Sequence, residues 1–159
     1  MNDVNIYTIK GYVFSTSFNK LYVTLNDAFL NTYLLIYNLK TGERLAELNL
    51  PELTSDIDLS LDGQFLYNTV YQHVYVRYAS TGELIQEVPM VYPREPYEDL
   101  NLFNDFMVIS PDGKKGYTGP LPGFAGTIAI LDLETLIFSD LVWPYGPRNP
   151  CLICIVPKK

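Results

Sequence analysis

Short apolar runs separated by turn residues recur along the whole chain. In the segment 56–70, apolar residues lie on both sides of the pair Asp62-Gly63. Asp-Gly favours a tight turn because glycine adopts positive φ without steric cost. No segment of ten residues shows a convincing helical period. The pattern predicts an all-β chain, with strands in this region at about 56–61, 64–71, 74–79 and 84–88.

The same pattern of four strands occurs three times. Ser60-Leu-Asp-Gly63 and Ser110-Pro-Asp-Gly113 open two of the units, and Lys40-Thr-Gly-Glu43 matches Ser80-Thr-Gly-Glu83 before the last strand of two units. Apolar runs such as Ile128-Ala-Ile-Leu131 imply strands that are covered on both faces. Units of this length and pattern are typical of β-propeller blades. We predict a single domain over 1–159, with four-stranded antiparallel blades at about 11–50, 55–90 and 105–142.

The segments outside these three units also have strand character. Residues 5–9 are predicted to be the outer strand of a preceding blade, and residues 151–156 the first strand of a following one. Closed propellers usually have about four to eight blades, so three blades leave open sheet edges. Three arrangements remain open: a part of a longer propeller, a head-to-tail ring of two or more copies, or a small irregular propeller whose ends pair.

Two motifs carry a resemblance to a known family. Tyr22-Val-Thr-Leu-Asn26 lies on the second strand of the first unit, with one residue inserted relative to a Tyr-Val-Thr-Asn signature, and Ser110-Pro-Asp-Gly-Lys114 opens the third unit. From about residue 5 to 141 the chain therefore resembles the YVTN-type β-propeller repeat family. Two features differ from that family. Of the third strands of the three units, only one keeps the family's aspartate, at Asp132, and the first unit lacks Asp-Gly.

The resemblance implies a propeller fold and is weak for function, since propellers host unrelated activities. It also implies an alternative function, because propellers of this kind form part of periplasmic amine dehydrogenases and of lactonase-like hydrolases. In that case the chain would be part of an oxidoreductase or a hydrolase. A periplasmic or extracellular location stays open.

Composition and charge limit the partners. The chain has 159 residues, of which 48% are hydrophobic and 14% aromatic, so it is long and apolar enough to bury a core. A formal net charge of -7 disfavours nucleic acid or an anionic membrane as the main partner. The apolar run at 151–156 is too short to span a bilayer.

Asp56 and Asp58 are the first candidates for chemistry. Period two places them on one face of a strand, where they would line a central channel or hold a cation. A calcium loop of the EF-hand type beginning at Asp56 would need glycine at Leu61 and glutamate at Tyr67, so that motif fails. We therefore predict that Asp62-Gly63 is a structural turn and that there is no metal site.

Cysteine and histidine chemistry is also disfavoured. Cys151 and Cys154 form a C-x-x-C in a predicted strand, where they point to opposite faces, and no second cysteine pair completes a zinc site. His73 is the only histidine, and no nucleophile lies in a recognisable catalytic motif. We predict no catalytic residue and no cofactor.

The loops at the two ends of the predicted blades differ. Turns between the first and second strands and between the third and fourth strands are short, whereas the remaining loops are long and rich in proline and aromatic residues. Loops on a rigid scaffold often carry function, and Tyr, Trp and Arg dominate binding hot spots. The sequence therefore predicts a non-enzymatic binding protein, with a protein or peptide partner or copies of itself. The predicted binding residues are Phe29, Tyr92, Arg94, Tyr97, Phe124, Trp143, Tyr145 and Arg148.

Overall fold

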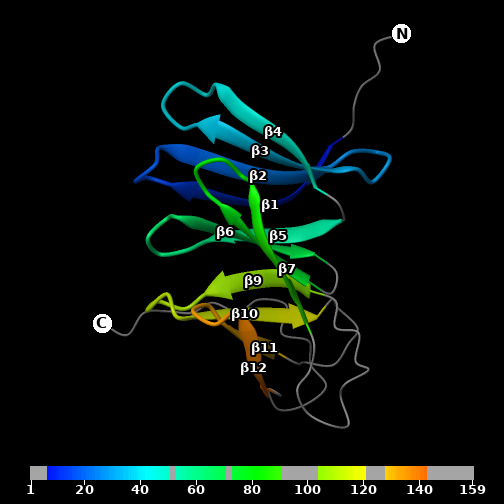
Figure 1. Cartoon of the computed structure of the whole chain (residues 1–159). Helices are drawn as coiled ribbons and strands as arrows, with labels where there is room; N and C mark the ends of the chain where they lie inside the picture. The colour runs from blue at the N-terminus through cyan, green and yellow to red at the C-terminus, as the bar shows by residue number, and fades with distance from the viewer. Residues whose placement is uncertain (1–6, 51–52, 71–72, 91–103, 121–127, 143–159) are drawn as a thin grey trace.

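Three four-stranded antiparallel sheets make up the fold (Figure 1). The computed structural model describes residues 7–50, 53–70, 73–90, 104–120 and 128–142. Blade 1 consists of β1 (Thr8–Ser15), β2 (Lys20–Asn26), β3 (Thr32–Asn38) and β4 (Arg44–Leu50); blade 2 of β5 (Thr54–Leu59), β6 (Phe65–Val70), β7 (His73–Tyr78) and β8 (Leu84–Pro89); blade 3 of β9 (Asn104–Ile109), β10 (Lys115–Pro120), β11 (Ile128–Asp132) and β12 (Ile137–Val142). Strands that follow each other in the chain pair within each sheet.

This arrangement confirms the predicted all-β fold of propeller-type units, and none of the described residues lies in a helix. Consequently no helix in these ranges is long and apolar enough to cross a membrane. The strands of blade 2 lie within one or two residues of their predicted positions.

The first strand of blade 1 differs from the prediction. Thr8 and Ile9 belong to β1, where Thr8 pairs with Asn26 and Ile9 with Leu25, and not to a separate strand at 5–9. The register shifts between Ile9 and Gly11, so Lys10 is an extra residue in a bulge. A bulge breaks the two-residue alternation from which strands are recognised, which explains why the start of β1 was missed.

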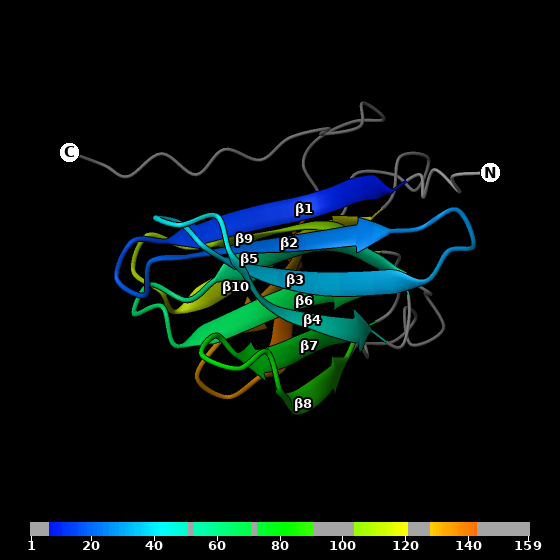
Figure 2. The ribbon, with the colours of Figure 1, turned by 90° about the horizontal axis from the view of Figure 1, so that it is seen from above.

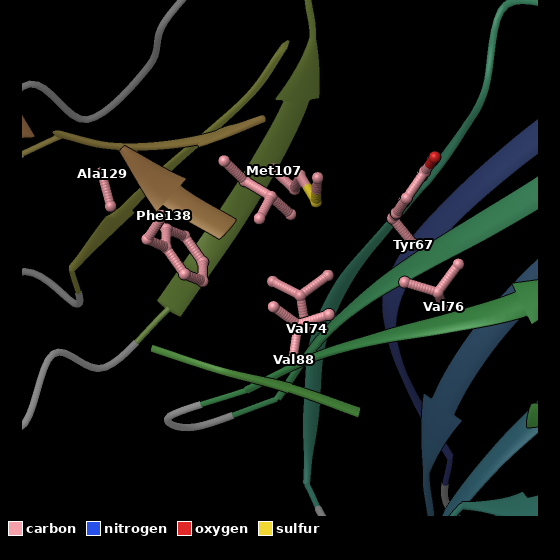
Figure 3. Close-up of a cluster of buried hydrophobic side chains, with 8 residues drawn as sticks. Tyr67, Val74, Val76, Val88, Met107, Ala129 and Phe138 are labelled. Atoms are coloured by element: carbon pink, nitrogen blue, oxygen red, sulfur yellow. The ribbon is translucent and has the colours of Figure 1, made fainter. Parts of the chain in front are cut away.

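Two apolar interfaces hold the blades together. In the first interface, Tyr22, Leu34 and Ile36 of blade 1 pack with Ile57 and Leu66 of blade 2. In the second, shown in Figure 3, side chains from blades 2 and 3 interlock. Its buried members are Tyr67, Val74, Val76, Val88, Met107, Ala129, Leu131 and Phe138.

The inner strands β1, β5 and β9 also lie next to one another, as Figure 2 shows from above. A Cβ atom added at Gly11 would lie 2.6 Å from Oδ1 of Asp56 and 2.9 Å from the backbone nitrogen of Ile57. The two backbones therefore approach each other at a distance that only glycine permits.

Carboxylates of β5 join blade 2 to blade 3. The backbone N–H of Met107 donates to Oδ2 of Asp56 at 3.1 Å, and the N–H of Ile109 donates to Oδ2 of Asp58 at 2.9 Å. Strand β9 pairs with β10 on its other side, so these N–H groups belong to its free edge. The two carboxylates thus provide acceptors for donors that would otherwise lie unpaired between blades.

The Ser-x-Asp-Gly segments form the predicted turns. Oδ1 of Asp62 accepts the hydroxyl of Ser60 at 2.6 Å and the N–H of Gln64 at 3.0 Å, and Asp112 repeats this arrangement with Ser110 and Lys114. Gly63 has a φ of 74°, in the left-handed region that favours glycine. What repeats in these segments is the chemistry of the turn.

Replacing Gly11 by alanine tests the close approach of β1 and β5. Because the new Cβ would meet backbone atoms of β5 that cannot rotate away, we expect Gly11→Ala to lower the free energy of unfolding by about 1–3 kcal/mol. Urea denaturation measures the change, and Lys10→Ala at the exposed neighbouring position is the control. Equal midpoints for Gly11→Ala and the wild type would contradict the close approach.

Candidate functional site

The loop between β2 and β3 is organised by one carboxylate. Oδ1 of Asp27 accepts the backbone N–H groups of Phe29 and Asn31, each at 2.9 Å, while Oδ2 accepts the side-chain amide of Asn31 at 2.8 Å and the hydroxyl of Tyr33 at 3.3 Å. The N–H of Leu30 donates to the backbone carbonyl of Asp27 at 3.1 Å. Aspartate is favoured in such turns because its short side chain reaches the backbone two to four residues on.

This loop presents two large apolar side chains to solvent. Phe29 is 85% exposed and Leu30 is 65% exposed. Leu30 has a φ of 66°, a conformation that costs a non-glycine residue energy and persists where surrounding contacts impose it. Close by, the rings of Tyr7 and Tyr33 meet edge to face at 6.4 Å between centroids. We call Tyr7, Phe29, Leu30 and Tyr33 the tip surface.

The electrostatics of the tip surface follow from these bonds. The side-chain hydrogen bond from Asn31 holds the pKa of Asp27 below its ordinary value, and the N–H groups of Asn31 and Phe29 lower it further. Desolvation, followed by the charge of Asp27, raises the pKa of Tyr33. At neutral pH the loop is therefore held by an ionised Asp27 and a neutral Tyr33.

Among the predicted binding residues, the structure describes Phe29 and places it at this exposed tip. The others lie outside the described residues: Tyr92, Arg94, Tyr97, Phe124, Trp143, Tyr145 and Arg148. Cys151 and Cys154 also lie outside them. Sequence reasoning missed Leu30 and the role of Asp27, although an aspartate and an asparagine four residues apart around an apolar pair is a usable signal.

Asp56 and Asp58 act as acceptors between blades. Burial raises the pKa of Asp58, against the opposing effect of the hydrogen bonds from Ile109 and Leu59. Within the described ranges, no group of three or more His, Cys, Asp or Glu side chains is arranged to hold a metal ion. The hydrogen bonds to β9 give Asp56 and Asp58 a role in joining blade 2 to blade 3.

His73 takes part in contacts between neighbouring strands. Its Nε2 lies 3.2 Å from Oε1 of Glu87 on β8, and its ring stacks on Tyr75 at 6.2 Å between centroids. These contacts place His73 in the packing of blade 2.

Comparison with known proteins identifies the fold. No protein-family model matches the chain, and no curated protein matches its sequence. Hydrazine synthase of Kuenenia stuttgartiensis has a TM-score of 0.70 at 15% identity, with 91% of this chain and 39% of that chain covered. The β-propeller domain of Cps50 (Swd1) from Myceliophteria thermophila has a TM-score of 0.68 at 13% identity, covering 87% of this chain and 43% of that one.

The WD40 repeats of RRP9 give a TM-score of 0.66 at 7% identity, covering 88% of this chain and 40% of that chain. The chain is thus an all-β protein made of β-propeller blades, similar to WD40-type propellers. It spans well under half the length of each of these three structures.

Asp27→Ala tests whether the carboxylate orders the loop. We expect at least tenfold faster amide hydrogen exchange at Phe29 and Asn31, because both N–H groups lose their acceptor. Asp132→Ala is a matched control, since Asp132 accepts the N–H groups of Glu134 and Thr135 in a blade 3 turn. Unchanged exchange at Phe29 in Asp27→Ala would contradict the assignment.

The loop should also depend on pH. Because the folded pKa of Asp27 is lowered, its contribution is complete above the ordinary value of 3.8 and is lost as pH falls through the folded pKa. Protection factors at Phe29 and Asn31, corrected for intrinsic exchange, should therefore stay constant from neutral pH down to about pH 4 and then fall. A constant protection at more acid pH would contradict this role of the ionised carboxylate.

Proposed function

We propose that this propeller-type chain is a non-enzymatic scaffold that binds a protein or peptide through the end of the blades that carries the tip surface. Phe29 is its anchor. The remaining predicted contacts at the same end are Tyr92, Arg94, Tyr97, Phe124, Trp143, Tyr145 and Arg148.

The observation that carries the proposal is the combination of exposure and order in the β2–β3 loop. Large apolar side chains at 85% and 65% exposure are held in place by the four hydrogen bonds to Asp27. A loop that is ordered before binding loses less conformational entropy when a partner arrives. Aromatic side chains are also enriched at the buried centres of interfaces.

We further propose that the repeats are of the YVTN type. Support comes from Tyr22 and Thr24, the residues of the Tyr-Val-Thr motif that face blade 2. The hydroxyl of Tyr22 donates to the carbonyl of Ala79 at 2.7 Å, and the hydroxyl of Thr24 donates to the carbonyl of Gly11 at 3.2 Å. Both signature side chains thus have a structural reason to recur.

Selection of peptides from a displayed library tests the binding role. Peptides selected on the wild-type protein should bind Phe29→Ser at least tenfold more weakly, a loss of about 1.4 kcal/mol. Leu39→Ser is the control, because Leu39 is exposed in the β3–β4 turn at the other end of blade 1. Equal affinities for wild type and Phe29→Ser, or an equal loss in Leu39→Ser, would overturn the role of the tip.

Self-assembly is supported by a different surface. The face of blade 1 turned away from blade 2 carries Tyr12 and Val23 side by side on β1 and β2, next to Leu35 on β3, which is buried. Tyr12 and Phe14 are 68% and 59% exposed, and no sheet of described residues packs on this face, since blade 1 is the end member of the stack in Figure 1. We propose that a second copy of the chain covers it with a blade, as blade 1 covers blade 2.

Light scattering tests the assembly. The wild type should have at least twice the mass of one chain, and Tyr12→Lys with Phe14→Lys should reduce it to the mass of one chain, because two charges cannot be buried unpaired. Leu39→Lys is the surface control. A wild type with the mass of one chain at every concentration would exclude assembly from copies.

A further inference from the structure

The two interfaces between blades can be compared position by position. In the first interface, two side chains of β2 reach across to the β7–β8 turn of blade 2. The Nζ of Lys20 donates to the carbonyl of Ser80 at 2.6 Å, and the hydroxyl of Tyr22 donates to the carbonyl of Ala79 at 2.7 Å. An ammonium group and a phenol group from blade 1 therefore occupy the turn end of this interface.

The register defines the equivalent residues in the second interface. Lys20 pairs with Asn38 at one end of the β2–β3 ladder, and Phe65 pairs with Tyr78 at the same end of the β6–β7 ladder. Two residues further on, Tyr67 corresponds to Tyr22. Blade 2 thus keeps the phenol and has a phenylalanine where blade 1 has the lysine.

Tyr67 lacks the bond that Tyr22 makes. Its side chain is almost fully buried, at 3% exposure, and no described residue exchanges a hydrogen bond with its hydroxyl. In Figure 3 this hydroxyl points away from Val74 and Val76. Desolvation, followed by the charge of Asp62, raises the pKa of Tyr67, so the phenol is neutral and lies near a carboxylate. Tyr67 also lines the open cavity described next, so its hydroxyl is available to a ligand there.

The position that the lysine fills in the first interface borders an open cavity at the surface of the second. Its volume is about 290 Å³, near the lower limit of about 300 Å³ for small-ligand sites. The polar lining consists of Ser60, Asp62, Tyr67, Asp112, Lys114 and Glu134, and Phe65 and Leu133 form apolar walls. Three carboxylates and one ammonium group are among the lining groups, and this net negative charge favours a cationic ligand over an anionic one.

The carboxylates of the two turns stay charged at neutral pH. The hydroxyl of Ser60 is the main cause that lowers the pKa of Asp62, and the hydroxyl of Ser110 does the same for Asp112. The hydrogen bonds within each turn use Oδ1 of the aspartate. The walls thus combine negative charge with an apolar lining suited to an alkyl chain.

We propose that this cavity binds a primary alkylammonium group, which takes the place that the Lys20 ammonium takes in the first interface. The ammonium would lie by the hydroxyl of Tyr67 and the acidic turns, with its alkyl chain against Phe65 and Leu133. A lysine side chain of a partner and a free alkylamine both supply this chemistry. The site lies at the short-turn end of the blades, so it is independent of the tip surface.

Chemical-shift titration of the full chain with butylammonium chloride and with an acetyl-lysine methylamide tests the proposal. Saturable shifts are expected at the amides of Asp62, Gly113 and Glu134 with at least one of the two probes. A stronger response to the lysine derivative indicates a protein partner, and a stronger response to butylammonium indicates a free amine. Butanol, which lacks the charge, and tetramethylammonium, which lacks N–H donors, should not saturate the site.

Two variants connect the binding to the proposed position. Phe65→Lys restores the lysine found in blade 1, so its own ammonium should occupy the site and weaken binding of the probes at least tenfold. Asp62→Asn keeps the turn acceptor and removes one charge, and should weaken binding several-fold, whereas Glu43→Gln, in the β3–β4 turn of blade 1 and outside the cavity lining, should leave it unchanged. The thermal unfolding midpoint of each variant confirms that the variant is folded.

Absence of saturation with both amines would overturn the proposal. So would butanol binding as well as butylammonium, or unweakened binding in a folded Phe65→Lys variant. The peptide-selection result for Phe29 does not affect these outcomes, because it reports on the other end of the blades.

Discussion

The structure depends on the close packing of its inner strands. Each sheet pairs only with itself, so the blades are held together by side chains and by the distance to which β1, β5 and β9 can approach. At Gly11 that distance leaves no room for a Cβ atom above the backbone of Ile57. Between β5 and β9 it is just wide enough for the carboxylates of Asp56 and Asp58 to accept backbone N–H groups of the next blade. The apolar interfaces extend outward from this line of contact, and their side chains are packed between the blade faces.

This constraint explains how far the sequence could be interpreted. The turns were predictable because their chemistry is local: Asp62 bonds to residues two positions away, and Gly63 supplies the positive φ. The start of β1 was not predictable, because the bulge at Lys10 interrupts the alternation of buried and exposed side chains from which strands are recognised. The first unit lacks Asp-Gly, yet β1 and β2 are also joined by a tight turn, with Asn19 at a φ of 53°. Asparagine tolerates the left-handed region better than most residues, so the turn persists under a different sequence.

The candidate site was predictable only in part, for a related reason. Exposure of Phe29 follows from its place in a polar loop, but its orientation depends on Asp27, whose bonds reach Phe29, Asn31 and Tyr33 together. For Asp56 and Asp58 the position on the strand was predictable, but the hydrogen-bond partners were not. Period two placed them correctly on one face of a strand, but their partners are 51 residues away in the chain. A pattern within one strand contains no information about a donor on another blade.

Comparison of equivalent positions in different blades gives information that a single motif or a single blade does not. Tyr22 and Tyr67 occupy equivalent positions on the second strands of their blades, so the residues beside them can be compared directly. The second interface has Phe65 where the first has Lys20, and acidic turns line the space beside it. A substitution made only for packing would be expected to close the space or to remove the charge. The second interface combines this space, the negative charge of the turns and a phenol without a hydrogen-bond partner among the described residues, and together they define the chemistry of a ligand that would fit.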